Sequence, residues 1–221
     1  WKKIFPHHEY DTNYGLTETT GPGCVHLGME NIAKVGAIGV PGFDWECRIA
    51  DFELQPLPQG EPGELLVRGP GVIKEYYKTP EATAATIKDG WLLTGDIARI
   101  DEDGFIWLVD RAKDIIITGG ENIFPVEIES HIMGHPKVQD VGVIGLPDER
   151  LVEIVAAIIK AKPNQTLTEE EVADFCKGLP RYKRPRKIIF GEVPRSPTGK
   201  IEKPKLRKTY TGISEKIRRT E

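Results

Sequence analysis

The stretch Asp110–Glu129, DRAKDIIITGGENIFPVEIE, decides how the rest of the chain is interpreted. An apolar run ends at Gly119–Gly120, and Pro125 follows. Because proline suits the first turn of a helix, the pattern predicts a strand, a turn and a helix that ends near Met133. Paired glycines also allow a backbone to approach a narrow ligand closely, so this turn is either an ordinary connection or part of a binding site.

The residues before this stretch indicate short strands separated by glycines and prolines. We expect strands in Ile38–Ala50, Gly63–Gly69 and Trp91–Ile100. The apolar arms on either side of Asp101–Gly104 predict a β-hairpin, in which the glycine supplies a positive φ. This half of the chain is expected to form a β-barrel-like module.

The residues after the stretch alternate between strands and helices. Val138–Gly145 and Glu153–Lys160 are apolar runs that predict strands, and Thr168 and Glu171 have the spacing of a capping box at a helix start. The predicted fold class is therefore α+β. We expect a β-barrel-like domain over residues 1–109 and an α+β domain over residues 110–221, a length that allows each part its own core.

The net charge of −4 hides an uneven distribution. Acidic residues outnumber basic ones in residues 1–180, whereas basic residues dominate residues 181–221. The basic end is either a solvated surface or a site that attracts a polyanionic small molecule, a nucleic acid or a membrane surface. No apolar run of about 18 residues occurs, so no transmembrane segment is predicted.

The cysteines and the start of the chain bear on its origin. Cys24, Cys47 and Cys176 lack metal-ligand spacing, which predicts reduced thiols in a cytoplasmic protein. The chain starts at Trp1 without a charged and then apolar leader, so we expect it to be a fragment of a longer polypeptide.

The segment Asn13–Gly21, NYGLTETTG, is the first candidate site. Its hydroxyl groups suit a phosphate, and the carboxylate of Glu18 suits the Mg²⁺ that accompanies a nucleoside triphosphate. The alternative interpretation is a polar loop with a helix cap.

Two further motifs each present one charged side chain. Asp96 ends WLLTGD, where an aspartate can accept both hydroxyls of a ribose, although aspartate after glycine is also common in turns. Lys200 ends PRSPTGK (Pro194–Lys200), where two prolines and a glycine hold it on a turn. It is either a solvated lysine or a cation held ready for an anion. The spacing of the glycines excludes a Walker phosphate loop at this place.

Taken in order, these motifs resemble those of the adenylate-forming superfamily, which contains acyl-CoA synthetases, adenylation domains and firefly luciferase. The similar segments, which span nearly the whole chain, are YGLTET, GELLVRG, KEYYKTPEAT, GWLLTGD, DRAKDIIITGGENIFPVEIE, LPRYKRP and PRSPTGK. GGENIFPVEIE after DRAKDIII is similar to fatty-acyl and aryl CoA ligases. Peptide-synthetase adenylation domains have an asparagine where Thr198 stands here.

The resemblance implies roles for individual residues. Tyr14 would stack on adenine, Thr17 would donate to the α-phosphate as a catalytic residue, and Glu18, also catalytic, would bind Mg²⁺. Asp96 and Arg111 would bind the ribose. The nucleotide- and cofactor-binding residues implied in this way are Asn13, Tyr14, Gly15, Asp96, Arg111, Gly119, Gly120 and Lys183.

The same resemblance implies a moving domain. Residues 1–109 would be the C-terminal part of a large AMP-binding domain, and the residues from Asp110 onward a mobile domain hinged at that residue. Lys200 would be the catalytic residue that reaches the substrate carboxylate and the α-phosphate during adenylation. Rotation would then withdraw this lysine, bring Gly119–Gly120 towards the pantetheine arm of coenzyme A, and let Lys183 meet its phosphates.

The implied function is that of an ATP-dependent carboxylate–CoA ligase. It would convert a carboxylic acid, expected to be a fatty acid, into acyl-AMP and then into acyl-CoA, using ATP, Mg²⁺ and coenzyme A. The alternatives are an aryl-CoA ligase and a non-catalytic nucleotide- or CoA-binding fragment. The N-terminal phosphate loop is missing, so the fragment alone is expected to be inactive. A nucleic-acid partner is not expected, because the acidic residues before 181 repel a phosphate backbone.

Overall fold

The computed structural model describes residues 3–7, 11–28 and 33–218, with side chains as far as residue 211. The chain divides into two compact units, an N-terminal unit from Trp1 to Ala112 and a C-terminal unit from Lys113 to Glu221. The α+β class predicted from the sequence is confirmed. Trp1, on which the expectation of a fragment rested, lies outside the described residues.

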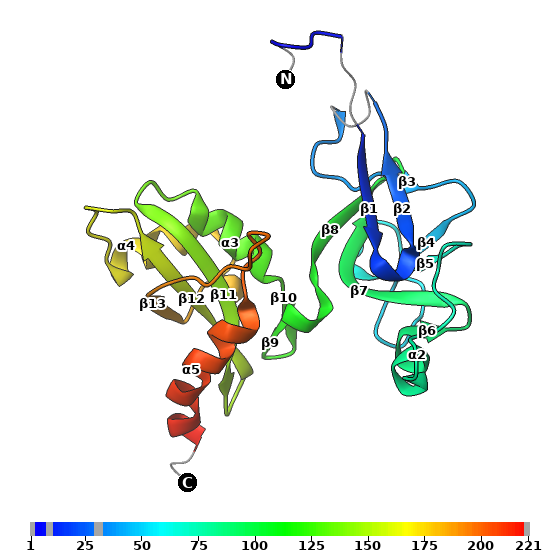
Figure 1. The fold of residues 1–221 in the computed structure, drawn as a ribbon. Coiled ribbons are helices and arrows are strands. Elements are labelled where there is room, and N and C mark those ends of the chain that lie inside the picture. The colour runs from blue at the N-terminus through cyan, green and yellow to red at the C-terminus, as the bar shows by residue number, and fades with distance from the viewer. Residues whose placement is uncertain (1–2, 8–10, 29–32, 219–221) are drawn as a thin grey trace. The chain divides into compact units, whose positions relative to one another are not determined.

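The N-terminal unit contains two antiparallel sheets (Figure 1). One has the order β1-β2-β3, and the other has the order β4-β5-β7-β6 with β8 paired to β7. The strands are β1 (Thr12–Leu16), β2 (Gly21–His26), β3 (Val40–Pro41), β4 (Glu46–Ala50), β5 (Gly63–Arg68), β6 (Ile87–Lys88), β7 (Trp91–Ile100) and β8 (Ile106–Arg111). The helical elements that the structure bounds in this unit include η1 (Thr17–Thr19), α2 (Pro80–Thr86) and η2 (Ala112–Asp114), which runs into the next unit.

An isolated bridge between Gly39 and Ile106 links these two sheets. Within the described part of the unit they form no closed barrel, so the β-barrel-like module is two linked open sheets. Apolar side chains from both sheets share one core, in which Cys24, Leu65 and Leu92 are fully buried. The core therefore holds β1 and β2 in place beside the larger sheet.

The hairpin of β7 and β8 confirms the turn predicted at Asp101–Gly104. Ile100 pairs with Ile106, and Gly104 has a φ of +87°. The Asp101 carboxylate accepts hydrogen bonds from the backbone N–H groups of Asp103 and Phe105 at 3.0 and 2.9 Å. An aspartate at the start of a turn commonly stabilises it in this way.

The C-terminal unit is a five-stranded sheet of order β10-β9-β12-β11, in which β13 pairs in parallel with β12. Its strands are β9 (Ile116–Thr118), β10 (Glu121–Ile123), β11 (Val138–Asp148), β12 (Val152–Ala161) and β13 (Lys187–Phe190). Its helical elements are α3 (Pro125–Met133), α4 (Glu169–Phe175), η3 (Cys176–Gly178), η4 (Arg181–Lys183) and α5 (Lys203–Arg218).

Both faces of this sheet are covered by helices. On β11, Val141 and Val143 belong to the core that contains Ile128 of α3 and Val172 of α4. The alternate residues of the same strand pack with Leu206 of α5 in a second core. Because successive side chains of a strand point to opposite faces, α5 and the pair α3 and α4 lie on opposite sides of the sheet.

Several local predictions for this unit are confirmed. Helix α3 begins at Pro125 and ends at Met133, as predicted. Thr168 caps α4: its side chain accepts from the backbone N–H of Glu171 at 3.2 Å, and the Glu171 carboxylate accepts from the Thr168 N–H at 3.0 Å. Cys176 of this unit is buried, and in the other unit the sulfur atoms of Cys24 and Cys47 lie 3.5 Å apart.

Candidate functional site

The first part of the site is a contact between β1 and β7. The Tyr14 hydroxyl donates a hydrogen bond to Asp96 Oδ2 at 2.5 Å. Burial raises the pKa of this hydroxyl, and the neighbouring Asp96 carboxylate raises it further, so Tyr14 stays neutral and acts as a donor. Two residues that are 82 positions apart in the chain are thus joined in one cluster.

Arg111 completes this cluster from β8. It is the cross-strand partner of Asp96, and its Nη1 lies 2.7 Å from Asp96 Oδ1. The Asp96 side chain is only 6% exposed, whereas that of Arg111 is 45% exposed. Each carboxylate oxygen therefore has one protein donor, while the guanidinium still reaches solvent. The cluster of Tyr14, Asp96 and Arg111 is called the carboxylate cluster below.

The turn that carries Asp96 is held by its neighbours. The backbone N–H of Gly95, whose φ is +70°, donates to Glu64 Oε1 at 2.9 Å. The Thr94 hydroxyl donates to the carbonyl of Leu65 at 2.7 Å and accepts from the Asp96 N–H at 3.1 Å. Sequence reasoning assigned no role to Glu64, although it lies in the quoted segment GELLVRG.

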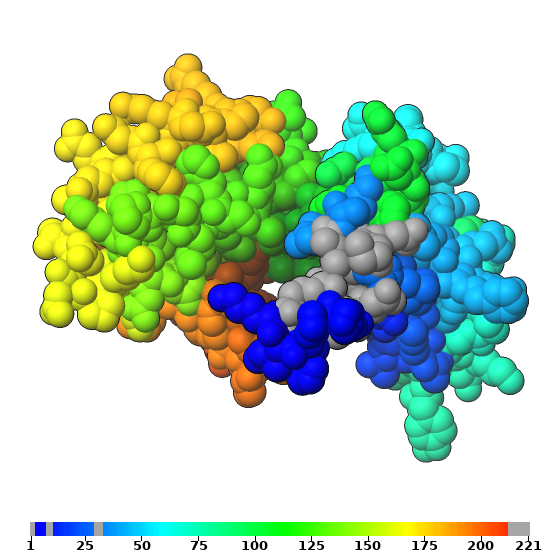
Figure 2. All heavy atoms as spheres, turned by 90° about the horizontal axis from the view of Figure 1, so that it is seen from above, coloured from blue at the N-terminus to red at the C-terminus, as the bar shows by residue number. Residues whose placement is uncertain are grey.

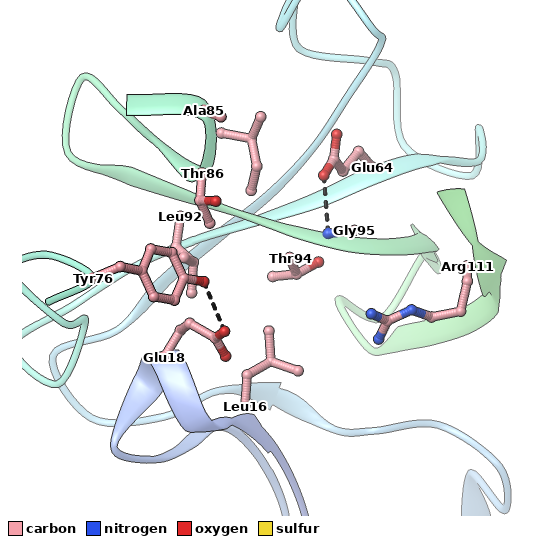
Figure 3. A pocket seen from close by; sticks show the side chains of 11 residues that line it. Leu16, Glu18, Glu64, Tyr76, Ala85, Thr86, Leu92, Thr94, Gly95 and Arg111 are labelled. Carbon is pink, nitrogen blue, oxygen red and sulfur yellow. Dashed lines mark hydrogen bonds between the residues drawn. The ribbon is translucent and has the colours of Figure 1, made fainter. Parts of the chain in front are cut away.

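Glu18 also has a partner that sequence reasoning missed. The Tyr76 hydroxyl donates to Glu18 Oε1 at 2.7 Å (Figure 3), and the hydrogen bond to this carboxylate raises the pKa of Tyr76. The backbone carbonyl of Glu18 accepts from the Ile73 N–H at 2.9 Å. The segment KEYYKTPEAT that contains Tyr76 was noted for its resemblance alone, because a contact across 58 residues leaves no local pattern.

A cavity of about 360 Å³ lies between Glu18 and Arg111 (Figure 3), whereas Tyr14 and Asp96 are not among the residues that line it. Glu18 and Tyr76 lie on one side of it, and Arg111 extends into it from β8 on another side. Its lining consists of Leu16, Glu18, Glu64, Tyr76, Ala85, Thr86, Leu92, Leu93, Thr94, Gly95 and Arg111. The charged lining residues are thus Arg111, which suits an anionic ligand, and the carboxylates Glu18 and Glu64, of which Glu18 could hold a metal ion carried by that ligand.

Asn13, Tyr14, Gly15 and Thr17 do not line this cavity. Asn13, Gly15 and Thr17 are exposed. A Cβ atom on Gly15 would lie 2.3 Å from the carbonyl oxygen of Gly21, at the point where the register of β1 and β2 shifts. The structure thus explains this glycine by a close approach of two backbones.

Asp110, the predicted hinge, is a buried residue of β8. Its Oδ1 accepts a hydrogen bond from the N–H of Arg111 at 2.7 Å. Two residues further on, the chain passes from the N-terminal unit to the C-terminal unit, between Ala112 and Lys113. The carboxylate of Asp110 therefore supports the backbone next to the carboxylate cluster.

Gly119 and Gly120 form the turn of the β9–β10 hairpin. Their φ angles are +59° and +89°, values that a two-residue hairpin turn of type I′ requires. A Cβ atom on Gly119 would approach Leu151 at 3.3 Å, whereas one on Gly120 would have nothing within 4 Å among the described atoms. Turn geometry explains both glycines, and Gly120 borders open space.

The loop with Lys200 lies between β13 and α5, on the surface of the C-terminal unit (orange in Figure 2). Gly199 has a φ of +82°, and the Ser196 N–H donates to the Lys200 carbonyl at 2.8 Å. The Lys200 N–H in turn donates to Ser196 Oγ at 3.2 Å. The side chain of Lys200 is exposed and has no hydrogen bond or ion pair to any other residue that the structure describes.

Lys183, predicted to meet the phosphates of coenzyme A, is engaged within its own unit. Its ammonium lies 2.7 Å from Glu127 Oε2 and also donates to Oε1 at 2.8 Å. Burial lowers the pKa of Lys183, but the hydrogen bonds to Glu127 outweigh this effect and raise it. An anion at this place would have to compete with a carboxylate.

Comparison with known families gives the class of protein. The sequence profile of the AMP-binding enzymes matches residues 1–77, and that of the AMP-binding enzyme C-terminal domain matches residues 127–200. The two matches cover more than half of the chain, which therefore belongs to the adenylate-forming superfamily of AMP-binding enzymes. Within that superfamily, the curated relatives that the chain matches include proteins named as CoA ligases and CoA synthases.

Two curated relatives illustrate this similarity. The chain is 43% identical over 200 residues to the long-chain-fatty-acid–CoA ligase FadD13 of Mycobacterium tuberculosis. The aligned region covers 90% of this chain and 39% of the relative. It is 40% identical over 200 residues to a feruloyl-CoA synthase of Amycolatopsis, with 89% of this chain and 40% of the relative covered. The chain thus spans about two fifths of the length of the relatives that it matches.

Solved structures support the same fold. ATP-bound MatB from Rhodopseudomonas palustris superposes on this chain with a TM-score of 0.86 and 36% sequence identity. The match covers 93% of this chain and 41% of the MatB chain. A second match is the o-succinylbenzoate CoA synthetase MenE from Bacillus subtilis in complex with its acyl-adenylate intermediate, with a TM-score of 0.81 and 34% sequence identity. This match covers 90% of this chain and 41% of the MenE chain.

No helix among the described residues is both long enough and apolar enough to cross a membrane. No group of three or more His, Cys, Asp or Glu side chains in the described part of the chain is arranged to hold a metal ion.

Proposed function

We propose that this chain is part of an ATP-dependent carboxylate–CoA ligase and contributes its nucleotide site and its adenylation lysine. The observation that carries the proposal is the carboxylate cluster next to a cavity that Glu18 and Arg111 line. A buried carboxylate with oriented donors on each side is suited to the two hydroxyls of a ribose. Relatives that are CoA ligases, and a similar structure with ATP bound, support the same function.

The proposed reaction has two steps. In the first, the substrate carboxylate attacks the α-phosphate of ATP, so that an acyl-AMP forms and pyrophosphate leaves. In the second, the thiol of coenzyme A attacks the acyl carbonyl, the thioester forms, and AMP leaves with the electron pair of the broken bond. Two anions approach each other in the first step, and a positioned cation stabilises the resulting transition state.

We assign that cation to Lys200. Its ammonium is a compact charge on an exposed side chain that no described carboxylate neutralises. Thr17 would donate to the α-phosphate, and Tyr14, with its hydroxyl held by Asp96, would place its ring against the adenine. Asn13, Gly15, Gly119, Gly120 and Lys183 stay predicted contacts of the nucleotide or of coenzyme A.

Glu18 fits the proposed Mg²⁺ site. Tyr76 binds one of its oxygens, and the other has no partner among the residues that the structure describes. Mg²⁺ is commonly held by one or two carboxylates together with substrate phosphates and water. When bound, the ion would neutralise charge on the phosphates; the part of Glu18 is to hold it, and that of Tyr76 to orient Glu18.

We propose a fatty acid as the carboxylic substrate. The relative named as a long-chain-fatty-acid–CoA ligase is 43% identical to this chain, and the feruloyl-CoA synthase, at 40%, supports the alternative of an aromatic acid. A cytoplasmic location stays a prediction.

The proposed function is tested with the full-length enzyme. Pyrophosphate release would be measured with ATP, Mg²⁺ and a panel of acids: saturated fatty acids of increasing length, ferulate and 2-succinylbenzoate. We expect release that depends on a fatty acid, and an acyl-CoA product when coenzyme A is added. If none of the acids in the panel supports pyrophosphate release, the proposed ligase activity is contradicted. Calorimetry of the 221-residue chain with ATP and coenzyme A would then test the alternative of a non-catalytic binding fragment.

The proposed hinge has its own test. Asp110 sits in the β7–β8 ladder, so a proline there would damage the sheet. Lys113 is exposed and outside the strands, which makes Lys113→Pro the better way to stiffen the joint. We expect it to change the rates of the two half-reactions unequally, by about tenfold in their ratio, whereas Lys113→Ala should not. Equal effects on both half-reactions would contradict a hinge.

A further inference from the structure

The loop that ends at Lys200 is tied to the sheet of the C-terminal unit by one arginine. Arg195 donates from Nε to Asp140 Oδ2 at 2.8 Å and from Nη2 to Asp140 Oδ1 at 2.6 Å. Its third group, Nη1, donates to the carbonyl of Gly199 at 2.5 Å. Asp140 belongs to β11, so the guanidinium bridges a rigid strand and the residue next to Lys200.

This arrangement depends on the shape of the arginine side chain. A guanidinium is planar and presents several N–H groups in a fixed fork, so it can bind both oxygens of a carboxylate and a third acceptor at once. A lysine at this position would keep the charge but lose that geometry. The hydrogen bonds from Arg195 also lower the pKa of Asp140, which keeps the pair charged near neutral pH.

A second anchor follows on the other side of Lys200. The ammonium of Lys203 lies 3.2 Å from Glu129 Oε1, and both side chains are buried. The same Glu129 oxygen accepts from the N–H of Val143 in β11 at 2.8 Å. The backbone of Lys200 is thus held between two ion pairs that both lead to β11.

Between these anchors the side chain of Lys200 stays without a described partner. A lysine has four rotatable bonds, so the protein controls where its ammonium goes mainly through its backbone. We infer that Arg195 is a positioning residue for Lys200, acting through the carbonyl of Gly199, and that Asp140 orients Arg195. This inference rests on the proposed function, in which Lys200 acts in adenylation.

Loss of the Arg195 fork should therefore slow one half-reaction and spare the other. The loop would sample more conformations, and the ammonium would reach its place for a smaller fraction of the time. The effect should be smaller than that of losing the lysine itself, about tenfold against about 10²- to 10³-fold. Thioester formation from added acyl-AMP does not need the lysine and should stay within about twofold.

The test uses the full-length enzyme with Arg195→Lys, Asp140→Asn and the double variant. Two rates are measured: ATP–pyrophosphate exchange and thioester formation from supplied acyl-AMP. We expect each single variant to reduce exchange by about tenfold, and the double variant to reduce it little further, because both changes remove the same contact. The matched control is Lys177→Met, which breaks the exposed Lys177–Asp174 ion pair between α4 and η3 of the same unit.

The outcomes separate this inference from the proposed function. Wild-type exchange in Arg195→Lys, or equal losses in both half-reactions, would overturn the positioning role. If Arg195→Lys gives one of these results while Lys200→Ala abolishes exchange, the positioning role of Arg195 is overturned and the proposed function stands. If Lys200→Ala leaves exchange unchanged, the proposed function fails together with the inference. Should Arg195→Lys lower the melting temperature strongly, Asp140→Asn, which keeps the shape of the side chain, decides the question.

Discussion

The carboxylate cluster and the Lys200 loop solve two different problems with opposite means. In the cluster, the side chains are bonded to one another: Tyr14 and Arg111 occupy both oxygens of Asp96. In the loop, the backbone is bonded and the side chain is left without a described partner. A site that binds a rigid sugar gains from fixed side chains. A cation that is needed in only one step gains from a fixed backbone and a mobile side chain.

Asp96→Asn should have the largest effect on the fixed side of this comparison. An amide cannot accept from both Tyr14 and Arg111, because its nitrogen would face one of these donors. We expect ATP to bind about 10- to 100-fold more weakly, since a buried contact is lost and a donor is left without an acceptor. Binding is measured by calorimetry.

Asp103→Asn is the matched control for that experiment. Asp103 is an exposed residue of the same unit that pairs with Lys34, away from the carboxylate cluster. Unchanged ATP affinity in Asp96→Asn, or an equal loss of affinity in both variants, would contradict the proposal that the carboxylate cluster binds the nucleotide.

Local signals explain which parts of the fold were predictable. Pro125, the glycine of Asp101–Gly104 and the Thr168–Glu171 pair each act within a few residues, and each predicted an element that the structure contains. Helix α5 was not predicted, because its basic sequence resembles a solvated tail and it is held by burial of Leu206 against the sheet. Strands β1 and β2 were likewise hidden in a polar motif.

The candidate site was predictable where a motif carried it. The motifs led to Asp96, Glu18 and Lys200, whereas Glu64 and Tyr76 entered through contacts across 31 and 58 residues. Arg195 contacts Asp140 across 55 residues. Long-range partners of this kind depend on tertiary packing and leave no periodic trace in a single sequence.

Tyr76→Phe sharpens the comparison at the Glu18 side of the cavity. Removing the hydroxyl leaves Glu18 without its donor, so the carboxylate is less well oriented. We expect the Mg²⁺ concentration for half-maximal ATP binding to rise by about two- to fivefold. The neighbouring Tyr77 is 81% exposed, so Tyr77→Phe serves as the control. A midpoint that falls, or that moves equally in both variants, would argue against an orienting role.

The smallest expected effect concerns the pH dependence of stability. Arg195 holds the pKa of Asp140 below its ordinary value of 3.8. A carboxyl group with a lowered pKa in the folded state stabilises the protein above its ordinary pKa, and that contribution is lost as the pH falls through the folded value. Because Arg195 is partly exposed, the contribution should be about 1 kcal/mol or less.

Denaturant unfolding of the chain and of Asp140→Asn at several pH values measures this contribution. The free energy of unfolding should differ between the two at pH 7, and the difference should shrink below about pH 4. A difference that is constant over this range would mean that the Asp140 charge does not stabilise the loop.

The central claim is that Lys200 serves adenylation and then has no further part. The most direct measurement compares both half-reactions in full-length Lys200→Ala, with the exposed Lys205→Ala as the control. We predict that ATP–pyrophosphate exchange falls by about 10²- to 10³-fold while thioester formation from supplied acyl-AMP stays near the wild-type rate. Normal exchange together with a collapse of thioester formation would contradict the account.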